Sequence, residues 1–116
     1  IAKIEADRQA ALATEASRKE KRRLAGLRSE YETAIRQKVS RNWIEPASSG
    51  NAVECVVLAQ QIPSGDVIDV NVLSCTGGGD ALARSVELAV RKASPLPLPK
   101  DPALFDRQLE FIFRPE

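Results

Sequence analysis

Two cysteines, Cys55 and Cys75, are the side chains in this sequence best suited to covalent chemistry, and the chain contains no histidine. Nucleophilic catalysis needs a base beside the nucleophile, and histidine is the base most often used. The cysteines do not form the CxxC pair of redox or zinc motifs, and without histidine a mixed metal site lacks its usual nitrogen ligands. The chemistry that remains for them is a bond to each other.

The carboxylates do not form an evident catalytic pair. Those that could act as acid and base fall in expected turns or on polar faces: Glu54, Asp66, Asp69, Asp80, Asp101 and Glu110. The run 76–80, TGGGD, precedes an expected helix but lacks the GKS and GxGxxG patterns of phosphate-binding loops. We therefore expect no enzyme activity, no metal and no cofactor.

The stretch 53–75, VECVVLAQQIPSGDVIDVNVLSC, predicts a β-hairpin with a cysteine near the outer end of each arm. Both arms are rich in β-branched residues, and the Pro and Gly between them suit a tight turn. Because side chains alternate between faces, both cysteines fall on one face. We expect the core face to carry Val56, Leu58, Ile62, Ile68, Val70 and Val72, and the other face Cys55, Val57, Ala59, Gln61, Asp69, Asn71, Leu73 and Cys75.

The register of this hairpin decides whether the cysteines can bond. A three-residue loop, 63–65, leaves Cys55 diagonal to Cys75, whereas a five-residue loop, 63–67, places them opposite. Diagonal neighbours are about 7–8 Å apart, and a disulfide needs Cα atoms about 4.4–6.8 Å apart. A bond therefore requires the wider loop or a bulge, and would suit an oxidising compartment such as a periplasm. The alternative is two separate cysteines that pack as small apolar side chains.

The first 28 residues differ in composition from the remainder. Residues 1–28 are rich in alanine and charged side chains, which predicts a solvated helical stalk, and residues 29–116 are predicted to form one globular domain. The net charge of +1 offers no field that would attract nucleic acid, and no apolar run is long enough to cross a bilayer. Because the chain begins at Ile1 without a signal peptide, we expect any anchor or export signal to lie upstream.

Two helices are predicted on either side of the hairpin. The first, over 29–43, has Ser29 as N-cap, Glu32 completing a capping box, and an apolar stripe at Tyr31, Ile35, Val39 and Trp43. Gly26 either marks a break from the stalk or lies in a continuous helix at a cost of about 1 kcal/mol. Residues 47–51 are predicted to form a loop. The second helix, over 81–93, has Asp80 as N-cap, and its apolar face is formed by Leu82, Val86, Ala89, Val90 and Ala93.

The last segment predicts a crossover and a final strand. Three prolines in 95–99 favour an extended connection, 101–106 one helical turn, and 108–114 a strand. The expected fold is α+β: an N-terminal helix, then helix-β-β-helix-β with a three-stranded antiparallel sheet. A strand reached by a long crossover is often a sheet edge, which offers unpaired backbone groups to another chain. We expect partner binding at Gln108, Leu109, Glu110, Phe111, Ile112, Phe113 and Arg114.

Several pieces of this sequence occur in an order that resembles the C-terminal domains of the TolA family. They are Trp43 followed by Pro46, the cysteine-flanked hairpin with QQIP at 60–63, VRKASPLP at 90–97, and FDR at 105–107 leading to FIFRP at 111–115. The match covers residues 31–116, and the helix before it is similar to the end of the long helical domain of TolA. TonB C-terminal domains are the runner-up, although their usual Tyr-Pro and Trp-x-Phe-x-Pro segments are absent. A stalk protein without energy coupling and a cytosolic enzyme fragment are alternatives of other classes.

The resemblance implies a periplasmic protein-binding domain of the Tol-Pal system, held by an upstream inner-membrane anchor. The implied partners are TolB and Pal, with TolQ and TolR acting through the anchor, and colicins and filamentous phage as parasitic ligands. The implied roles are cell-envelope integrity, outer-membrane constriction in cell division, and colicin import. A TonB-type domain would instead deliver energy to outer-membrane transporters.

Overall fold

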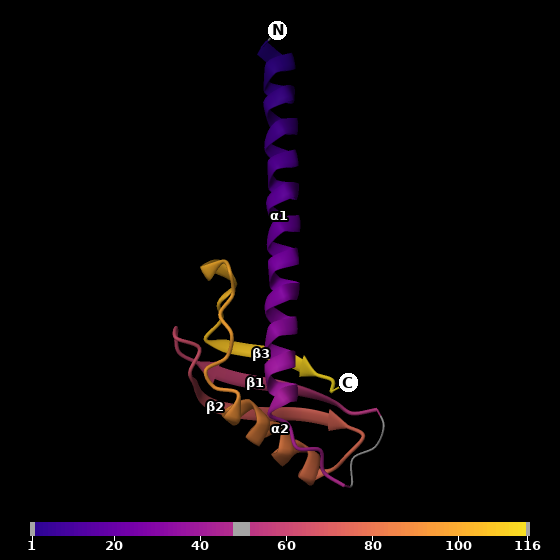
Figure 1. Ribbon diagram of the computed structural model, residues 1–116. Helices are drawn as coiled ribbons and strands as arrows, with labels where there is room; N and C mark the ends of the chain where they lie inside the picture. The colour runs from indigo at the N-terminus through magenta and orange to yellow at the C-terminus, as the bar shows by residue number, and fades with distance from the viewer. Residues whose placement is uncertain (1, 48–51, 116) are drawn as a thin grey trace.

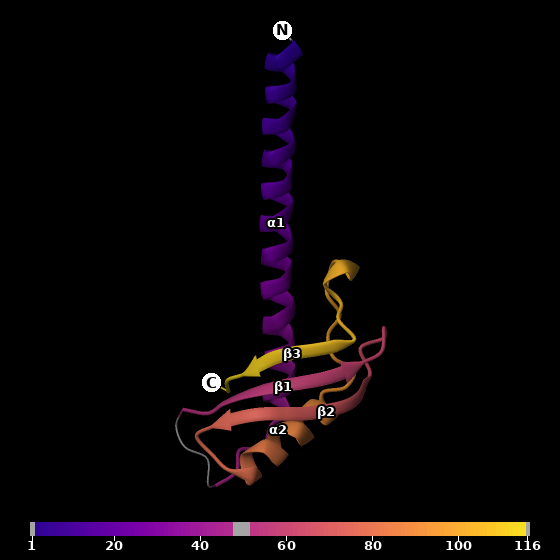
Figure 2. The same cartoon turned by 180° about the vertical axis from the view of Figure 1, so that it is seen from behind.

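The computed structural model describes residues 2–47 and 52–115. Along the chain it contains helix α1 (Ala2–Arg41), strands β1 (Glu54–Gln61) and β2 (Val67–Thr76), helix α2 (Asp80–Lys92), a 3₁₀ turn η1 (Pro102–Leu104) and strand β3 (Gln108–Phe113). The strands form one antiparallel sheet in the order β2-β1-β3. Both helices lie against the same face of this sheet (Figures 1 and 2). The α+β fold predicted from the sequence is confirmed; most of the predicted loop 47–51 lies outside the described residues.

Helix α1 is one continuous element of 40 residues, so the prediction of a new helix capped by Ser29 is wrong. A side chain at Gly26 would meet nothing within 4 Å, which shows that this glycine lies on an open part of the helix surface. A single glycine in a helix costs only about 1 kcal/mol relative to alanine. The strong helix formers on both sides of Gly26 outweigh that cost, and the helix projects well beyond the sheet (Figure 1).

The C-terminal part of α1 packs on the sheet, as its apolar stripe predicts. Tyr31, Ile35 and Val39 are buried, and Trp43 just beyond the helix contacts Phe113 edge-to-face with ring centroids 5.6 Å apart. Residues 2–23 are exposed. Arg23 forms an ion pair with Asp101 at 3.0 Å, which links the start of the packed half of α1 to the turn η1.

The core face of β1 is the reverse of the predicted one. Cys55, Val57 and Ala59 have no exposed surface, whereas Val56 and Leu58 are half-buried on the face that carries no helix. Alternation alone gives no preference here because both faces of β1 are apolar. The predicted core residues of β2 are partly correct: Val70 is buried and Val72 packs against the core, but Ile68 is 61% exposed.

Strand β2 contains two β-bulges, at Ile68 and at Leu73, and the one at Leu73 explains how Cys75 joins the same face as Val70 and Val72. The register pairs Gln60 with Asp69 but Gln61 with Val67, and it shifts again between Val56 and Val57. Each bulge adds one residue to β2, which changes the parity of the strand. The short turn is retained, since Ile62 N donates to Asp66 O at 3.1 Å, and the two bulges bring Cys75 directly opposite Cys55.

Helix α2 buries the face that its spacing predicts: Leu82, Val86, Ala89 and Val90, continued by Ala93 beyond the helix. The predicted cap is wrong, because Asp80 is the first helical residue and Gly79 occupies the cap position without a side-chain hydrogen bond.

The segment that connects α2 to β3 is hydrogen-bonded to the hairpin turn. Leu96 N donates to Gly65 O at 2.8 Å, and Val67 N donates to Ser94 Oγ at 2.9 Å. Gly65 has φ of +89°, and a Cβ there would lie 2.4 Å from Leu96 O. Glycine is therefore required at this turn both by its backbone conformation and by the close approach of the crossover.

Candidate protein-binding site

Strand β3 forms one edge of the sheet, beside β1 and away from β2. Leu109, Phe111 and Phe113 are buried under α1, and Glu110 and Ile112 are exposed on the other face. The strand ends one residue earlier than predicted: Arg114 lies beyond it and pairs with Glu54 at 3.0 Å. The predicted binding segment is therefore at an edge, and its anchoring side chains lie in the core.

The register shows which backbone groups of β3 face outward. Gln61 N donates to Arg107 O at 2.8 Å, and the same register pairs Ala59 with Leu109 and Val57 with Phe111. Antiparallel ladders alternate between bonded and non-bonded pairs. The N–H and C=O groups of Gln108, Glu110 and Ile112 consequently point away from β1, toward the free edge.

Helix α1 passes close to this edge and leaves two adjoining hollows beside it. The first, of about 390 Å³, lies along the middle of β3 and is lined by Glu32, Arg36, Val56, Glu110, Phe111 and Ile112. The second, of about 490 Å³, lies at the C-terminal end of β3 and is lined by Thr33, Arg36, Gln37, Ser40, Arg41, Trp43, Arg114 and Pro115. Arg36 lines both, so together they make a groove between α1 and the edge of β3, which we call the β3 groove. This groove was not among the features predicted from the sequence.

The opposite edge, β2, is irregular. Its two bulges interrupt the ladder, and Asp69 near its start pairs with Arg91 of α2 at 3.5 Å. Bulges and charged side chains are the usual means by which proteins prevent pairing at an exposed strand edge. The two edges of the sheet therefore differ, with β3 regular and β2 interrupted.

Cys55 and Cys75 are joined by a disulfide bond. Cys55 is completely buried and Cys75 is partly buried against the core. The bond ties β1 to β2 at the end of the hairpin far from its turn, where the chain continues into α2. Neither cysteine lines the β3 groove, so the bond acts as a structural link.

The perturbed ionisable groups in the described part of the chain also have structural roles. Burial raises the pKa of Tyr31, whose hydroxyl accepts a hydrogen bond from Gln61 Nε2 at 3.2 Å. The backbone N–H of Ala103 lowers the pKa of Asp101, and Arg23 lowers it further. Residues 2–47 and 52–115 contain no group of three or more His, Cys, Asp or Glu side chains that could hold a metal ion.

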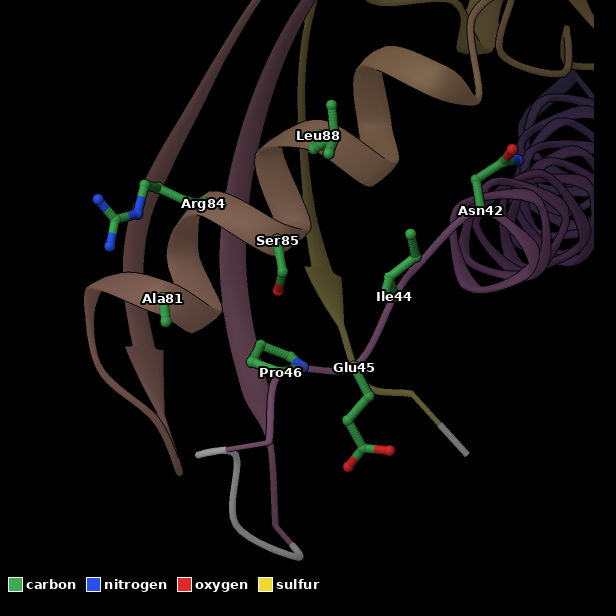
Figure 3. Close-up of a pocket in the computed structure, with 8 residues that line it drawn as sticks. All are labelled: Asn42, Ile44, Glu45, Pro46, Ala81, Arg84, Ser85 and Leu88. Carbon is green, nitrogen blue, oxygen red and sulfur yellow. The ribbon is translucent and has the colours of Figure 1, made fainter.

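A further hollow of about 360 Å³ lies between the segment after α1 and the outer face of α2 (Figure 3). Ile44 and Leu88 approach it from these two elements, and they are 68% and 50% exposed. Ser85, which also lines it, accepts a hydrogen bond from Trp43 Nε1 at 2.9 Å.

None of the α-helices in the described residues is long and apolar enough to span a membrane.

Two helices on one face of a three-stranded antiparallel sheet, with one regular strand edge left unpaired, define a small α+β module with the geometry of a peptide-binding domain. The TonB C-terminal family model matches residues 28–113, and the chain therefore belongs to the TonB C-terminal family. No curated protein sequence matches the chain significantly.

The solved structures that resemble this fold include a TolA domain and a TonB C-terminal domain. One is the solution NMR structure of TolAIII bound to a peptide derived from the N-terminus of TolB, with 31% identity, a TM-score of 0.62, and coverage of 74% of this chain and 73% of that one. The other is the Helicobacter pylori TonB C-terminal domain, with 19% identity, a TM-score of 0.57, and coverage of 74% and 92%. The predicted resemblance to TolA and TonB C-terminal domains is confirmed.

Proposed function

We propose that this chain is the partner-binding end of a TolA-type envelope protein, and that it binds another polypeptide by adding its strand to β3. The observation that supports this most directly is the regular edge of β3. Three residues there, Gln108, Glu110 and Ile112, present unpaired backbone donors and acceptors along one line. Strand addition uses such groups for affinity and alternate side chains for selectivity.

The proposed partner is the N-terminal segment of a TolB protein. Support comes from the TolAIII structure, which contains a peptide from that part of TolB and shares 31% identity with this chain. The cysteine-flanked hairpin and the charged helix ahead of the domain are the features that resemble TolA. On this proposal the domain works in the periplasm within the Tol-Pal system, and an upstream anchor connects it to TolQ and TolR. Pal, colicins and filamentous phage are then further ligands.

A TonB-type role is the second candidate. The matching family model describes TonB C-terminal domains, and the Helicobacter pylori TonB domain has the same fold. In that case the same β3 edge would receive a short segment of an outer-membrane transporter. The two candidates thus share a binding surface and differ in the partner sequence that the surface selects.

The test is a binding experiment with the ¹⁵N-labelled chain and two synthetic peptides. One peptide has the N-terminal sequence of TolB from the same bacterium, and the other has a TonB-box sequence from an outer-membrane transporter. We expect the TolB peptide to bind more tightly and to shift the amide resonances of β3. Tighter binding of the transporter peptide would favour the TonB-type role, and shifts that spare β3 would overturn strand addition.

A matched pair of variants at Glu110 tests the backbone contacts. Proline at this position removes an outward N–H without removing a bond to β1, since edge positions are where strands tolerate proline. Glu110→Pro should therefore weaken peptide binding by about two- to tenfold, the effect of losing one hydrogen bond. Glu110→Ala loses the same carboxylate but keeps the N–H, and it should bind as the wild type does. Equal effects of the two variants would show that the side chain, not the backbone edge, makes the contact.

A further inference from the structure

The part of the β3 groove at the C-terminal end of β3 has an unusual charge for this protein. Its charged lining residues are Arg36, Arg41 and Arg114, and the rest of the lining is Thr33, Gln37, Ser40, Trp43 and Pro115. Among the described residues, this lining contains no carboxylate, whereas the chain as a whole carries 16 acidic and 17 basic residues. Arg114 is paired with Glu54, so the net positive charge of this hollow comes from Arg36 and Arg41, and it favours an anion.

These arginines have donors left to use. Arg36 donates to Thr33 Oγ1 at 3.3 Å, and no carboxylate of the described residues lies within 4.0 Å of Arg36 or Arg41. Arg114 bonds to Glu54 through Nε. A guanidinium carries five N–H donors in a planar fork that matches a carboxylate. Each of the three can therefore donate hydrogen bonds to a carboxylate of another molecule.

The position of the arginines relates them to the edge of β3. Arg36 also lines the neighbouring hollow along the middle of the strand, where Glu32 and Glu110 are its charged companions. The charge of the β3 groove thus changes along the strand, from mixed beside Glu110 to positive beside Arg114. The middle of a strand added to β3 would lie beside Glu32 and Glu110. Only one end of the added strand would reach the three arginines.

We propose that the arginine end of the β3 groove binds acidic side chains at one end of the added strand, and so fixes the direction and register in which a partner segment pairs with β3. This inference rests on the proposed strand addition and specifies the chemistry of the partner: a short segment with Asp or Glu at the end that lies beside Arg114. An antiparallel partner would carry them at its N-terminal end, and a parallel partner at its C-terminal end.

The test uses the TolB N-terminal peptide with two-residue extensions. Four versions carry Asp-Asp or Asn-Asn at the N-terminal or the C-terminal end, and affinities are measured by calorimetry. We expect Asp-Asp at one end to tighten binding about fivefold relative to Asn-Asn, as for a few partly exposed ion pairs, and to have no such effect at the other end. The gain should disappear when NaCl is raised from about 0.05 M to about 0.5 M, because salt screens exposed charges.

Matched variants locate the effect. The double variant Arg36→Gln and Arg41→Gln should abolish the gain from Asp-Asp, whereas Arg18→Gln with Arg22→Gln, on the exposed upper part of α1, should retain it with the same change in net charge. The inference is overturned if Asp-Asp tightens binding at neither end, tightens it equally at both, or still does so in the first double variant. If the Asn-Asn peptides bind β3 in all these cases, strand addition survives. If they do not bind β3, the proposed function fails together with this inference.

Discussion

Reduction of the Cys55–Cys75 bond should destabilise the domain by an amount that the structure allows us to calculate. The two cysteines are separated by 20 residues in sequence. In the chain-entropy model, opening a loop of this length costs about 3 kcal/mol at 25 °C. For a domain of this size, whose free energy of unfolding is expected to be about 5–10 kcal/mol, this is a large fraction of the total.

Chemical reduction is a cleaner perturbation than substitution, because Cys55 is completely buried and a smaller residue would add a cavity. The assay is urea unfolding of the oxidised and the fully reduced protein, followed by the fluorescence of Trp43, the only tryptophan, which packs on Phe113. With a slope of about 1–1.5 kcal/mol per M, the midpoint should fall by about 2–3 M.

The free-thiol count accompanies both curves. Two free thiols in protein purified without reductant would contradict the bond itself. A fall in the midpoint of less than about 0.5 M, with complete reduction confirmed, would show that the bond does not stabilise this fold by restricting the unfolded chain.

Two further predictions concern the turn and the buried tyrosine. Gly65→Ala should lower the free energy of unfolding by about 1–3 kcal/mol from the positive φ alone, with a further loss from the contact between the new Cβ and Leu96 O. Gly26→Ala, on the open surface of α1, is the control and should not destabilise the protein. Equal thermal midpoints for the two variants would contradict the reasoning. For Tyr31, burial raises the pKa above the ordinary 10.0, so its stabilising contribution is complete below pH 10 and is lost as pH rises through the raised value. Between about pH 9 and pH 11, the free energy of unfolding should therefore fall less in Tyr31→Phe than in the wild type. An equal fall in both proteins would show that the pKa of Tyr31 is not raised in the folded state.

Helical periodicity was the most reliable signal in this sequence. The face of α2 formed by Leu82, Val86, Ala89 and Val90 is buried as predicted, and so is the stripe of Tyr31, Ile35 and Val39 on α1. Around these stripes most of the other positions are polar or alanine, with Leu88 of α2 as an exposed exception, so the larger apolar side chains mark one face for the core. The final strand was predictable for the same reason, since Leu109, Phe111 and Phe113 alternate with exposed residues.

The core face of β1 could not be predicted because both of its faces are apolar. Alternation distinguishes faces only when one of them is polar, and here Val56 and Leu58 compete with Cys55 and Val57. The positions of the bulges in β2 could not be predicted from residue type. Glycine often marks a bulge, but the residues at the two register shifts are Ile68 and Leu73. Without the bulges, the parity of β2 cannot place Val70 and Cys75 on one face.

The candidate site was predicted in part. The placement of β3 at the sheet edge followed from its long crossover, whereas the binding role of the segment 108–114 stays a prediction. The arginines of the β3 groove were missed because Arg36 and Arg114 are far apart in sequence and meet only through packing. One signal was available: Arg36 follows the buried Ile35 directly, so it had to lie at the margin of the α1 stripe, beside the sheet rather than in open solvent.

The bulges of β2 connect the stability of the domain with its choice of binding edge. They bring Cys75 opposite Cys55 despite the short turn at Gly65, and the same two register shifts interrupt the regular alternation of backbone groups along β2. An irregular ladder is a poor template for another strand. The geometry that permits the disulfide thus leaves β3 as the only regular edge among the described strands, and a partner that pairs with the sheet is directed there. Leu73 is the residue that the register leaves without a partner, so its deletion should remove one bulge and still leave Cys75 opposite Cys55. The disulfide should therefore still form in this variant, while the more regular β2 becomes a competing edge for the partner strand.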